Sequence, residues 1–347
     1  MPLVYFLPVI FLYIFGLINL LGIRPDLVFS YLIFFAVGAI IFSAIKYLQV
    51  HRHFFRQNSV LFYWICIALL FLTLFFGSNI KGSRRWLDLY FFQIQMSEIF
   101  KVFFIVFLAK YFSAIRSPIE NSKVFLKTFI FALIPFILIF RQPDLAGALI
   151  VMVIYFVMLF HSSATKKQIL IFFAIAVILL PASWFFLADY QKNRVLSFVN
   201  PEIHSAGASY NMIQAKIAIG SGQIFGEGLG LGKQSRLYFL PEYHTDFAYS
   251  SLVEQFGFVG GAIVIFLYVI FISLLFISIG QNMDSTDVEN RYRFFYLLGF
   301  SVFLMIQTSI NIGMNLGIMP IAGITLPFIS YGGSSLITFL VALALIP

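Results

Sequence analysis

Apolar runs of about 18 residues or more recur along this chain of 347 residues, and they constrain its fold more than any other feature. A run of that length is typical of a helix that crosses a lipid bilayer. Apolar residues make up 61% of the chain, and charged residues only 10%, against about 25% in soluble domains. The composition therefore excludes a soluble enzyme, a disordered chain and a disulfide scaffold. We predict an all-α polytopic membrane protein.

The runs predict about ten transmembrane helices in a single domain that covers residues 1–347. The segment 188–250 is too long for an ordinary connection and too apolar for disorder. We expect it to form a long loop outside the cytoplasm, with an interfacial helix over residues 209–219. The ten helices are expected at residues 2–21, 27–45, 60–76, 97–112, 128–140, 145–160, 169–187, 250–279, 294–315 and 328–347.

The short loops differ in their content of Lys and Arg, which gather on the cytoplasmic side of membrane proteins. Eleven lie in the loops of one side, namely Lys46, Arg52, Arg56, Lys110, Arg116, Lys123, Lys127, Lys166, Lys167, Arg291 and Arg293. Five lie in the loops of the other side, namely Arg24, Lys81, Arg84, Arg85 and Arg141. We therefore expect both termini in the cytoplasm. The net charge of +8 is then interpreted as contact with anionic lipid, and no nucleic acid is expected as a partner.

A glycine-rich segment over residues 220–232 lies within the long loop. It is not a dinucleotide-binding motif, because that motif needs a preceding strand and a following helix. Two interpretations stay open. One is a flexible loop, and the other is a backbone that closely approaches a ligand such as a pyrophosphate.

Asp246 stands at the end of the same loop, immediately before a long predicted helix. Thr245 or Asp246 fits the N-cap of that helix, and capping alone would explain the aspartate. The alternative is that Asp246 acts as a general base at the boundary between water and lipid.

Further polar clusters are expected on the same side of the membrane, where polar groups are costly unless they are paired or functional. Glu98 and Lys101 are three residues apart on one helix and can pair. They form either a structural ion pair or two charges that face the reaction site. For residues 141–144 the two alternatives are a structural hairpin and contact with a lipid headgroup. The prolines and glycines between residues 311 and 335 predict irregular backbone at membrane depth.

Motifs in a fixed order along nearly the whole chain resemble those of the SEDS family of peptidoglycan polymerases, which includes RodA and FtsW. The matching motifs are Arg85-Trp86, Gln95 to Lys101, Gln142 to Leu145, Ala218 to Gly222, Leu240 to Glu242, Thr245 to Phe247, and Gly323 to Ser335. Residues 189–194, Tyr210-Asn211 and Gln214 resemble RodA more than FtsW. Met96 replaces a proline that is usual in the family.

The resemblance implies a peptidoglycan glycosyltransferase that polymerises lipid II at the outer face of the cytoplasmic membrane during cell elongation. The donor would be the glycan linked to undecaprenyl pyrophosphate, and the expected partner is a class B penicillin-binding protein. Asp246 matches the family's catalytic position. The candidate substrate-binding residues are Arg85, Glu98, Lys101, Gln142, Asp144, Arg194, Glu242, Thr245, Ser330 and Gly332.

The sequence identifies no metal ligands, and its cofactor requirement is unknown. A divalent cation such as Mg²⁺ is one candidate for stabilising the charge of the leaving pyrophosphate, and Arg85, Lys101 and Arg194 are others.

Two other functions compete with the enzyme. A flippase or transporter of lipid-linked precursor is favoured by the segments 141–147 and 313–333, which proline and glycine interrupt. The gathering of charges on one side, rather than at the midplane of the membrane, argues against it. A scaffold that activates a penicillin-binding protein is the third hypothesis, but a scaffold would not need Asp246.

Overall fold

The computed structural model describes residues 3–47, 50–80, 83–88, 93–115, 122–162, 165–199, 207–283 and 285–347. The chain forms two compact units. Unit 1 consists of Met1–Ser43, Asn193–Ile277 and Leu304–Val341. Unit 2 consists of Ala44–Lys192, Ser278–Phe303 and Ala342–Pro347. The single domain predicted from the sequence stays a prediction.

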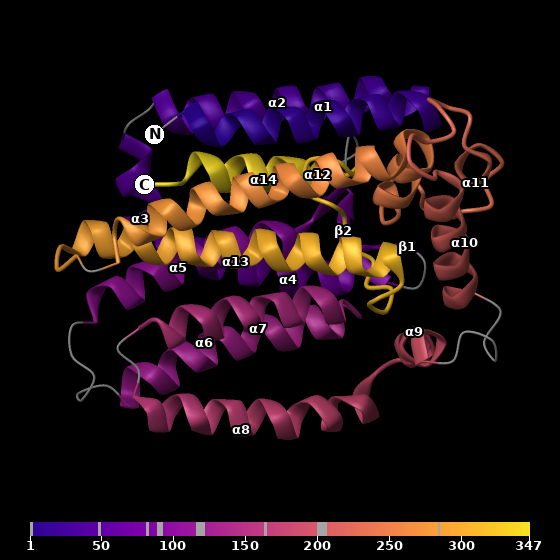
Figure 1. Cartoon of the computed structure of the whole chain (residues 1–347). Coiled ribbons are helices and arrows are strands. Elements are labelled where there is room, and N and C mark those ends of the chain that lie inside the picture. The colour runs from indigo at the N-terminus through magenta and orange to yellow at the C-terminus, as the bar shows by residue number, and fades with distance from the viewer. Residues whose placement is uncertain are drawn as a thin grey trace. The chain divides into compact units, whose positions relative to one another are not determined.

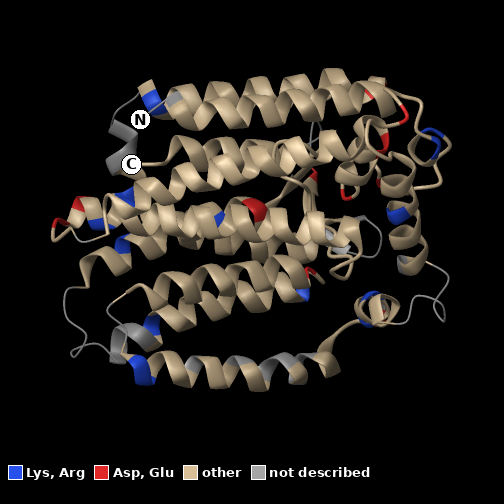
Figure 2. Ribbon diagram, viewed as in Figure 1, with Lys and Arg blue, Asp and Glu red and all other residues tan. Residues whose placement is uncertain are grey.

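A helix lies over each span that the sequence predicts (Figure 1). The helices are α1 (Phe6–Ile23), α2 (Val28–Tyr47), α4 (Ser59–Phe76), α5 (Met96–Ala114), α6 (Ser122–Arg141), α7 (Leu145–Phe160), α8 (Lys166–Ser183), α12 (Ala248–Gly280), α13 (Val288–Leu316) and α14 (Gly333–Ala344). Within the described residues, five spans are long and apolar enough to cross a membrane by length and composition. Lys, Arg, Asp and Glu fall mainly near helix ends and in the connections (Figure 2). The predicted polytopic helical fold is confirmed.

Shorter elements join these helices. They are the 3-10 turns η1 (Leu3–Tyr5), η2 (Pro25–Leu27) and η3 (Trp184–Phe186), and the helices α3 (Val50–Gln57), α9 (Asp189–Val199), α10 (Ala208–Ser221) and α11 (Lys233–Arg236). The helix predicted at residues 209–219 is therefore present as α10. Its contact with a bilayer stays a prediction.

Unit 2 is built on the helix pairs α4–α5 and α6–α7. Aromatic rings fill its core. The rings of Tyr63 and Phe107 stack with their centroids 4.6 Å apart, and the Tyr63 hydroxyl donates to the carbonyl of Phe131 at 2.8 Å. Because α5 is buried on nearly all sides, polar side chains on it are held inside protein rather than exposed to lipid.

A small antiparallel sheet in unit 2 was not predicted from the sequence. Its strands β1 (Ser78–Ile80), β2 (Ser83–Asp88) and β3 (Gln93–Gln95) pair in the order β1-β2-β3. In the register, Trp86 lies opposite Ser78 on one side and Gln95 on the other. Strands of three to six residues are too short to give a clear alternation of apolar and polar residues, so periodicity missed them.

The long loop packs against the rest of unit 1 through helix α10. Met212, Ala215 and Ala218 are three residues apart, so they share one face of this helix, and that face is buried. Other residues of unit 1 complete the cluster, namely Leu240, Tyr243, Phe247, Met314 and Ile321. This apolar packing fixes the segment that carries Asp246 against α10 and α13.

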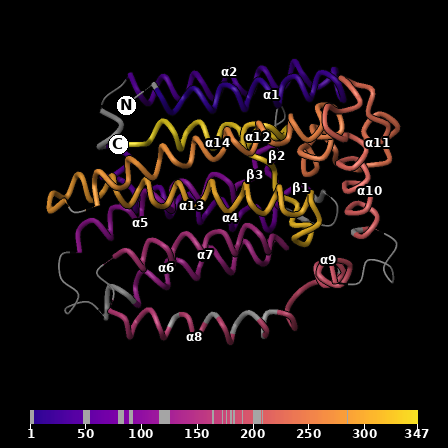
Figure 3. The backbone as a smooth tube through the Cα atoms, viewed as in Figure 1, coloured from indigo at the N-terminus to yellow at the C-terminus, as the bar shows by residue number. Residues whose placement is uncertain are grey.

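The glycine-rich segment packs its backbone directly against α12, and Figure 3 traces the chain through this region. Helix α12 is interrupted at Gly257, whose φ is +69°. Residues 227 and 228 donate their N–H groups to the carbonyls of Glu254 and Gln255, at 2.9 and 3.1 Å. Phe258 and Val259 donate in turn to Gln223 and Ile224, at 2.8 and 3.1 Å. These bonds pair the backbone groups of α12 on both sides of its interruption. The glycines, which have no side chain, allow the two backbones to approach each other this closely.

The break in α12 should tolerate only glycine. We expect Gly257→Ala to destabilise the protein by at least about 2 kcal/mol, because the new Cβ would occupy a left-handed conformation and collide with the Ile224 carbonyl. Gly220→Ala is the matched control, because Gly220 is helical and a Cβ there meets no atom within 4 Å. Thermal unfolding in detergent should show a large loss of stability for Gly257→Ala and none for Gly220→Ala. Equal unfolding curves would contradict the requirement for glycine at position 257.

Helix α14 begins later than predicted. Residues 317–332 are irregular, and Gly317, Gly323 and Phe328 have φ values of +69°, +66° and +65°. Left-handed residues and the two prolines of this segment cannot continue a helix, which is why the predicted helix at 328–347 is confined to Gly333–Ala344. The irregular backbone predicted before this helix is present.

Candidate active site

Asp246 belongs to a short segment, residues 242–247, whose backbone is fixed by side chains of α13. The backbone carbonyl of Asp246 accepts from the Nδ2 atoms of Asn311 and Asn315, at 3.0 and 3.1 Å. Both asparagines are fully buried and lie one turn apart. These bonds hold the main chain of Asp246 through its backbone carbonyl.

The same segment is tied to the irregular stretch before α14. Ser330 Oγ donates to the Thr245 carbonyl at 2.5 Å, and the Tyr331 N–H donates to the His244 carbonyl at 2.8 Å. Thr245 Oγ1 donates to Glu242 Oε2 at 2.7 Å. Three of the predicted residues therefore hold the segment in place, which is a positioning role.

Arg194 and Asp246 approach the same point beside Gly323. A Cβ added to Gly323 would lie 3.4 Å from Arg194 Nη1 and 3.6 Å from Asp246 Oδ2. Arg194 Nη1 also donates to the Ile321 carbonyl, at 3.5 Å. A carboxylate and a guanidinium thus lie beside the same glycine, which has no side chain of its own. Such a pair can accept a proton and bind an anionic group.

The capping alternative for Asp246 fits this geometry poorly. Helix α12 starts at Ala248, and its first helical bond runs from the Ser251 N–H to the Phe247 carbonyl, at 3.1 Å. Phe247 therefore occupies the N-cap position, and Asp246 precedes it by one residue. The bond pattern favours a role of the carboxylate outside the helix.

Arg24 and Asp26 pair near this segment, with Nη2 and Oδ2 2.7 Å apart. The Arg24 guanidinium keeps the pKa of Asp26 below its usual range. Burial raises the pKa of Tyr243, and the hydrogen bond with Arg24 opposes that rise. Asp26 is therefore ionised at neutral pH, and Tyr243 is neutral.

A second cluster of predicted residues lies in unit 2, around the start of α7. Arg85, which is 6% exposed, places Nη1 3.7 Å from Asp144 Oδ1, and it also donates to the carbonyls of Gln142 and Pro143. Asp144 caps α7 by accepting from the Gly147 N–H at 3.0 Å. Asp144 also accepts from Gln95 and Ser97, each at 3.3 Å. This network gives Arg85 and Asp144 a structural role at the start of α7.

Gln142 belongs to the same cluster and is fully buried. Its Nε2 donates to the Leu70 carbonyl at 2.8 Å, whereas its Oε1 is buried without a hydrogen-bond partner.

Glu98 and Lys101 form the ion pair that their spacing predicts. Lys101 Nζ donates to Glu98 Oε1 at 2.6 Å and lies 4.5 Å from the centre of the Phe303 ring. Lys101 is fully buried and Glu98 is 3% exposed. The closed geometry favours the structural alternative of the two that the sequence left open.

Gly332 is explained by packing at the start of α14. A Cβ at this position would lie 3.2 Å from Thr325 Cγ2, and the Gly332 carbonyl accepts the first helical bond, from Leu336. The role of Gly332 in substrate binding stays a prediction.

Two residues that organise unit 1, Glu254 and Asn315, were missed from the sequence. Glu254 is fully buried and accepts from the Gln234 and Ser235 N–H groups at 2.6 and 3.1 Å, and from Ser235 Oγ at 2.5 Å. Asn315 binds the site segment, as described above. The available signal was a polar side chain within an apolar helix, which is costly unless it is hydrogen-bonded.

The chain matches the cell cycle protein family FtsW/RodA/SpoVE over residues 2–347. It belongs to this family. The peptidoglycan glycosyltransferase MrdB of Escherichia coli K12 is 34% identical over 315 residues, which cover 90% of this chain and 82% of MrdB. A probable peptidoglycan glycosyltransferase FtsW of Buchnera aphidicola subsp. Baizongia pistaciae is 35% identical, over 86% of this chain and 78% of that protein.

Comparison with solved structures identifies the same family. RodA of Thermus thermophilus superimposes with a TM-score of 0.71 at 26% identity, over 99% of this chain and 94% of that one. A chain of a peptidoglycan synthase complex that coordinates polymerization and crosslinking gives a TM-score of 0.81 at 29% identity, over 99% and 95%. The FtsW/RodA/SpoVE protein described here is thus a membrane-embedded peptidoglycan glycosyltransferase of cell-wall synthesis, as the sequence predicts.

A divalent cation stays a prediction. Among the described residues, no group of three His, Cys, Asp or Glu side chains is placed to hold a metal ion. Mg²⁺ needs only one or two protein carboxylates when substrate phosphates complete its coordination, and Asp246 and Glu242 are carboxylates of the site segment.

Proposed function

We propose that this protein polymerises lipid II into glycan strands at the outer face of the cytoplasmic membrane during cell elongation, with Asp246 as the general base. The observation that carries the proposal is the approach of Asp246 and Arg194 to the same point beside Gly323, on backbone that α13 and Ser330 hold in place. A proton acceptor with a fixed main chain, next to a cation, fits glycosyl transfer from a pyrophosphate.

In the proposed reaction, the 4-hydroxyl of the GlcNAc of an incoming lipid II attacks the anomeric carbon of the growing glycan. The new glycosidic bond forms as the bond to undecaprenyl pyrophosphate breaks, with inversion at that carbon. Asp246 accepts the hydroxyl proton, because a sugar hydroxyl is a poor nucleophile until it is deprotonated. One base is sufficient when no covalent intermediate forms, in contrast to the two carboxylates of a retaining hydrolase.

Arg194 is the proposed contact for the pyrophosphate. Of the three basic candidates, Arg85 and Lys101 are buried and are bonded to other residues of unit 2, whereas Arg194 is partly exposed. A guanidinium can bind two phosphate oxygens at once, which stabilises the leaving group as its negative charge develops. A bound Mg²⁺ would supply further positive charge to the same oxygens.

The proposed partner is a class B penicillin-binding protein, which would crosslink the new glycan by transpeptidation. The likeness to a chain of a complex that coordinates polymerization and crosslinking supports this proposal. Lipid II and the undecaprenyl-pyrophosphate-linked glycan are the proposed substrates.

The proposed topology places both termini in the cytoplasm and the segment 188–250 outside it, from the excess of Lys and Arg in one set of loops. A cysteine at exposed Lys233 should therefore react with a membrane-impermeant thiol reagent in intact cells, and a cysteine at exposed Thr286 should not. The natural Cys66 is buried and should give little background. A permeant reagent should label both variants. The opposite pattern would place Asp246 on the wrong side.

The function is tested by comparing polymerisation with transport. The purified protein, alone and with its penicillin-binding partner, is given labelled lipid II, and glycan strands are resolved by gel. The flipping of the same lipid is measured separately in vesicles. We expect strands and no flipping. Flipping without strands would support the transporter hypothesis, and strands that arise only from the partner would support a scaffold.

A further inference from the structure

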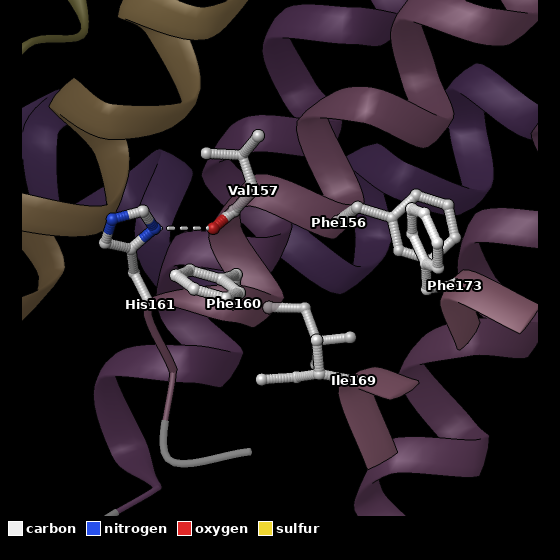
Figure 4. Close-up of a pocket in the computed structure, with 7 residues that line it drawn as sticks. Phe156, Val157, Phe160, His161, Ile169 and Phe173 are labelled. Atoms are coloured by element: carbon white, nitrogen blue, oxygen red, sulfur yellow. Dashed lines mark hydrogen bonds between the residues drawn. The ribbon is translucent and has the colours of Figure 1, made fainter. Parts of the chain in front are cut away.

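An apolar cavity of about 330 Å³ lies in unit 2, between the end of α7 and the beginning of α8 (Figure 4). Phe156 and Phe160 of α7 face it from one side, and Ile169 and Phe173 of α8 face it from the other. His161 stands at its edge, where Nδ1 is 2.9 Å from the Val157 carbonyl. The volume is that of a pocket for a small molecule, and the lining suits a hydrocarbon.

Helix α8 is apolar and buries none of its described side chains. Leu170, Phe173 and Ile178 are each 68% exposed, and their spacing places them on one broad face of the helix. A helix that is apolar all round is stable only inside protein or lipid. In a membrane protein, the apolar surface that α8 exposes is therefore covered by lipid.

Positive charge stands at the same end of α8. Lys166 and Lys167 are exposed in its first turn, and Ile169 of the cavity lies in the same turn. The turn is well defined, because the Thr165 N–H donates to Gln168 Oε1 at 2.9 Å and the Gln168 N–H donates to Thr165 Oγ1 at 3.4 Å. Two ammonium groups at the beginning of a helix attract an anion, and the partial positive charge of the helix end adds to the attraction.

We propose that this cavity binds one acyl chain of an anionic phospholipid whose headgroup phosphate lies against Lys166 and Lys167. The hydrocarbon lining selects the chain, and the two lysines select the charge of the headgroup. The site is distinct from the clusters around Asp246 and Asp144, and it makes no use of the proposed glycosyl transfer. It offers a way for membrane composition to fix the position of α8 against α7.

The test measures lipid binding to the purified full-length protein in detergent by native mass spectrometry. Palmitoyl-oleoyl-phosphatidylglycerol is compared with palmitoyl-oleoyl-phosphatidylcholine, which has the same chains and no net charge. We expect the anionic lipid to bind at least tenfold more tightly. Lys166→Gln with Lys167→Gln should remove this preference, since each lysine near a headgroup changes affinity by about fivefold. Lys233→Gln with Arg236→Gln, which removes two exposed charges elsewhere, should keep it.

A substitution that fills the cavity distinguishes the binding of a lipid from the binding of free phosphate. Ile169→Trp should weaken the binding of both lipids at least tenfold, whereas it would not affect the binding of free phosphate. Added sn-glycerol 3-phosphate should not displace the lipid. The thermal unfolding of Ile169→Trp is measured to show that it is folded; the lysine variants change only exposed side chains. Equal affinity for the two lipids, or a preference that survives loss of both lysines, would overturn the proposal.

Discussion

Replacing Asp246 with asparagine should lower the rate of lipid II polymerisation by roughly two to four orders of magnitude, which is the usual contribution of a general base. The substitution keeps the size of the side chain and removes its ability to accept a proton. The protein should fold normally, because Asn311 and Asn315 bind the backbone carbonyl of residue 246 and not its side chain. Polymerisation rates and thermal unfolding, measured on the same preparation, check both parts.

Asp26→Asn provides the matched control. Asp26 is an exposed aspartate of the same unit, and its pair with Arg24 is of the kind that contributes little to stability. Its loss should change polymerisation less than threefold. Equal losses in the two variants would mean that the assay reports general damage to unit 1, and the assignment of Asp246 as a base would be withdrawn.

Lys101→Met alone should destabilise the protein by about 3–5 kcal/mol, because it leaves the buried Glu98 carboxylate without its ammonium partner. Adding Glu98→Gln should restore most of that stability, because replacement of a whole buried ion pair is often neutral. Thermal unfolding of both variants in detergent is the measurement.

The same double variant decides between the two interpretations of this pair. If the pair is structural, as its burial favours, the double variant should polymerise lipid II at close to the normal rate. If the charges face the substrate, it should be folded and inactive. Arg56→Gln with Glu289→Gln is the control, since it removes an ion pair in which Glu289 is exposed and should have little effect on stability.

The helices of this protein could be predicted from the sequence because most of its apolar runs are about as long as a bilayer is thick. Membrane helices satisfy their own backbone, so length and composition are sufficient to place them. The pairing of Glu98 with Lys101 was equally predictable, since it depends on the spacing within one helix.

Features that depend on contacts between distant segments could not be predicted. The break at Gly257 is satisfied by residues about thirty positions earlier, and the carbonyl of Asp246 is bound by asparagines more than sixty positions later. The glycine-rich segment was interpreted as a flexible loop or a ligand cradle because its partner in α12 is not visible in the local pattern. The sequence identified Asp246 as a candidate, but its neighbours Arg194 and Gly323 came together only in the fold.

The most direct test of the central claim is the formation of glycan strands from labelled lipid II by the purified complex with its penicillin-binding partner, comparing the unmodified protein with Asp246→Asn. Both complexes are first shown to contain equal amounts of the two proteins. We expect strands from the unmodified complex and almost none from the variant. Strands at the unmodified level from an Asn variant whose mass has been verified would contradict the central claim.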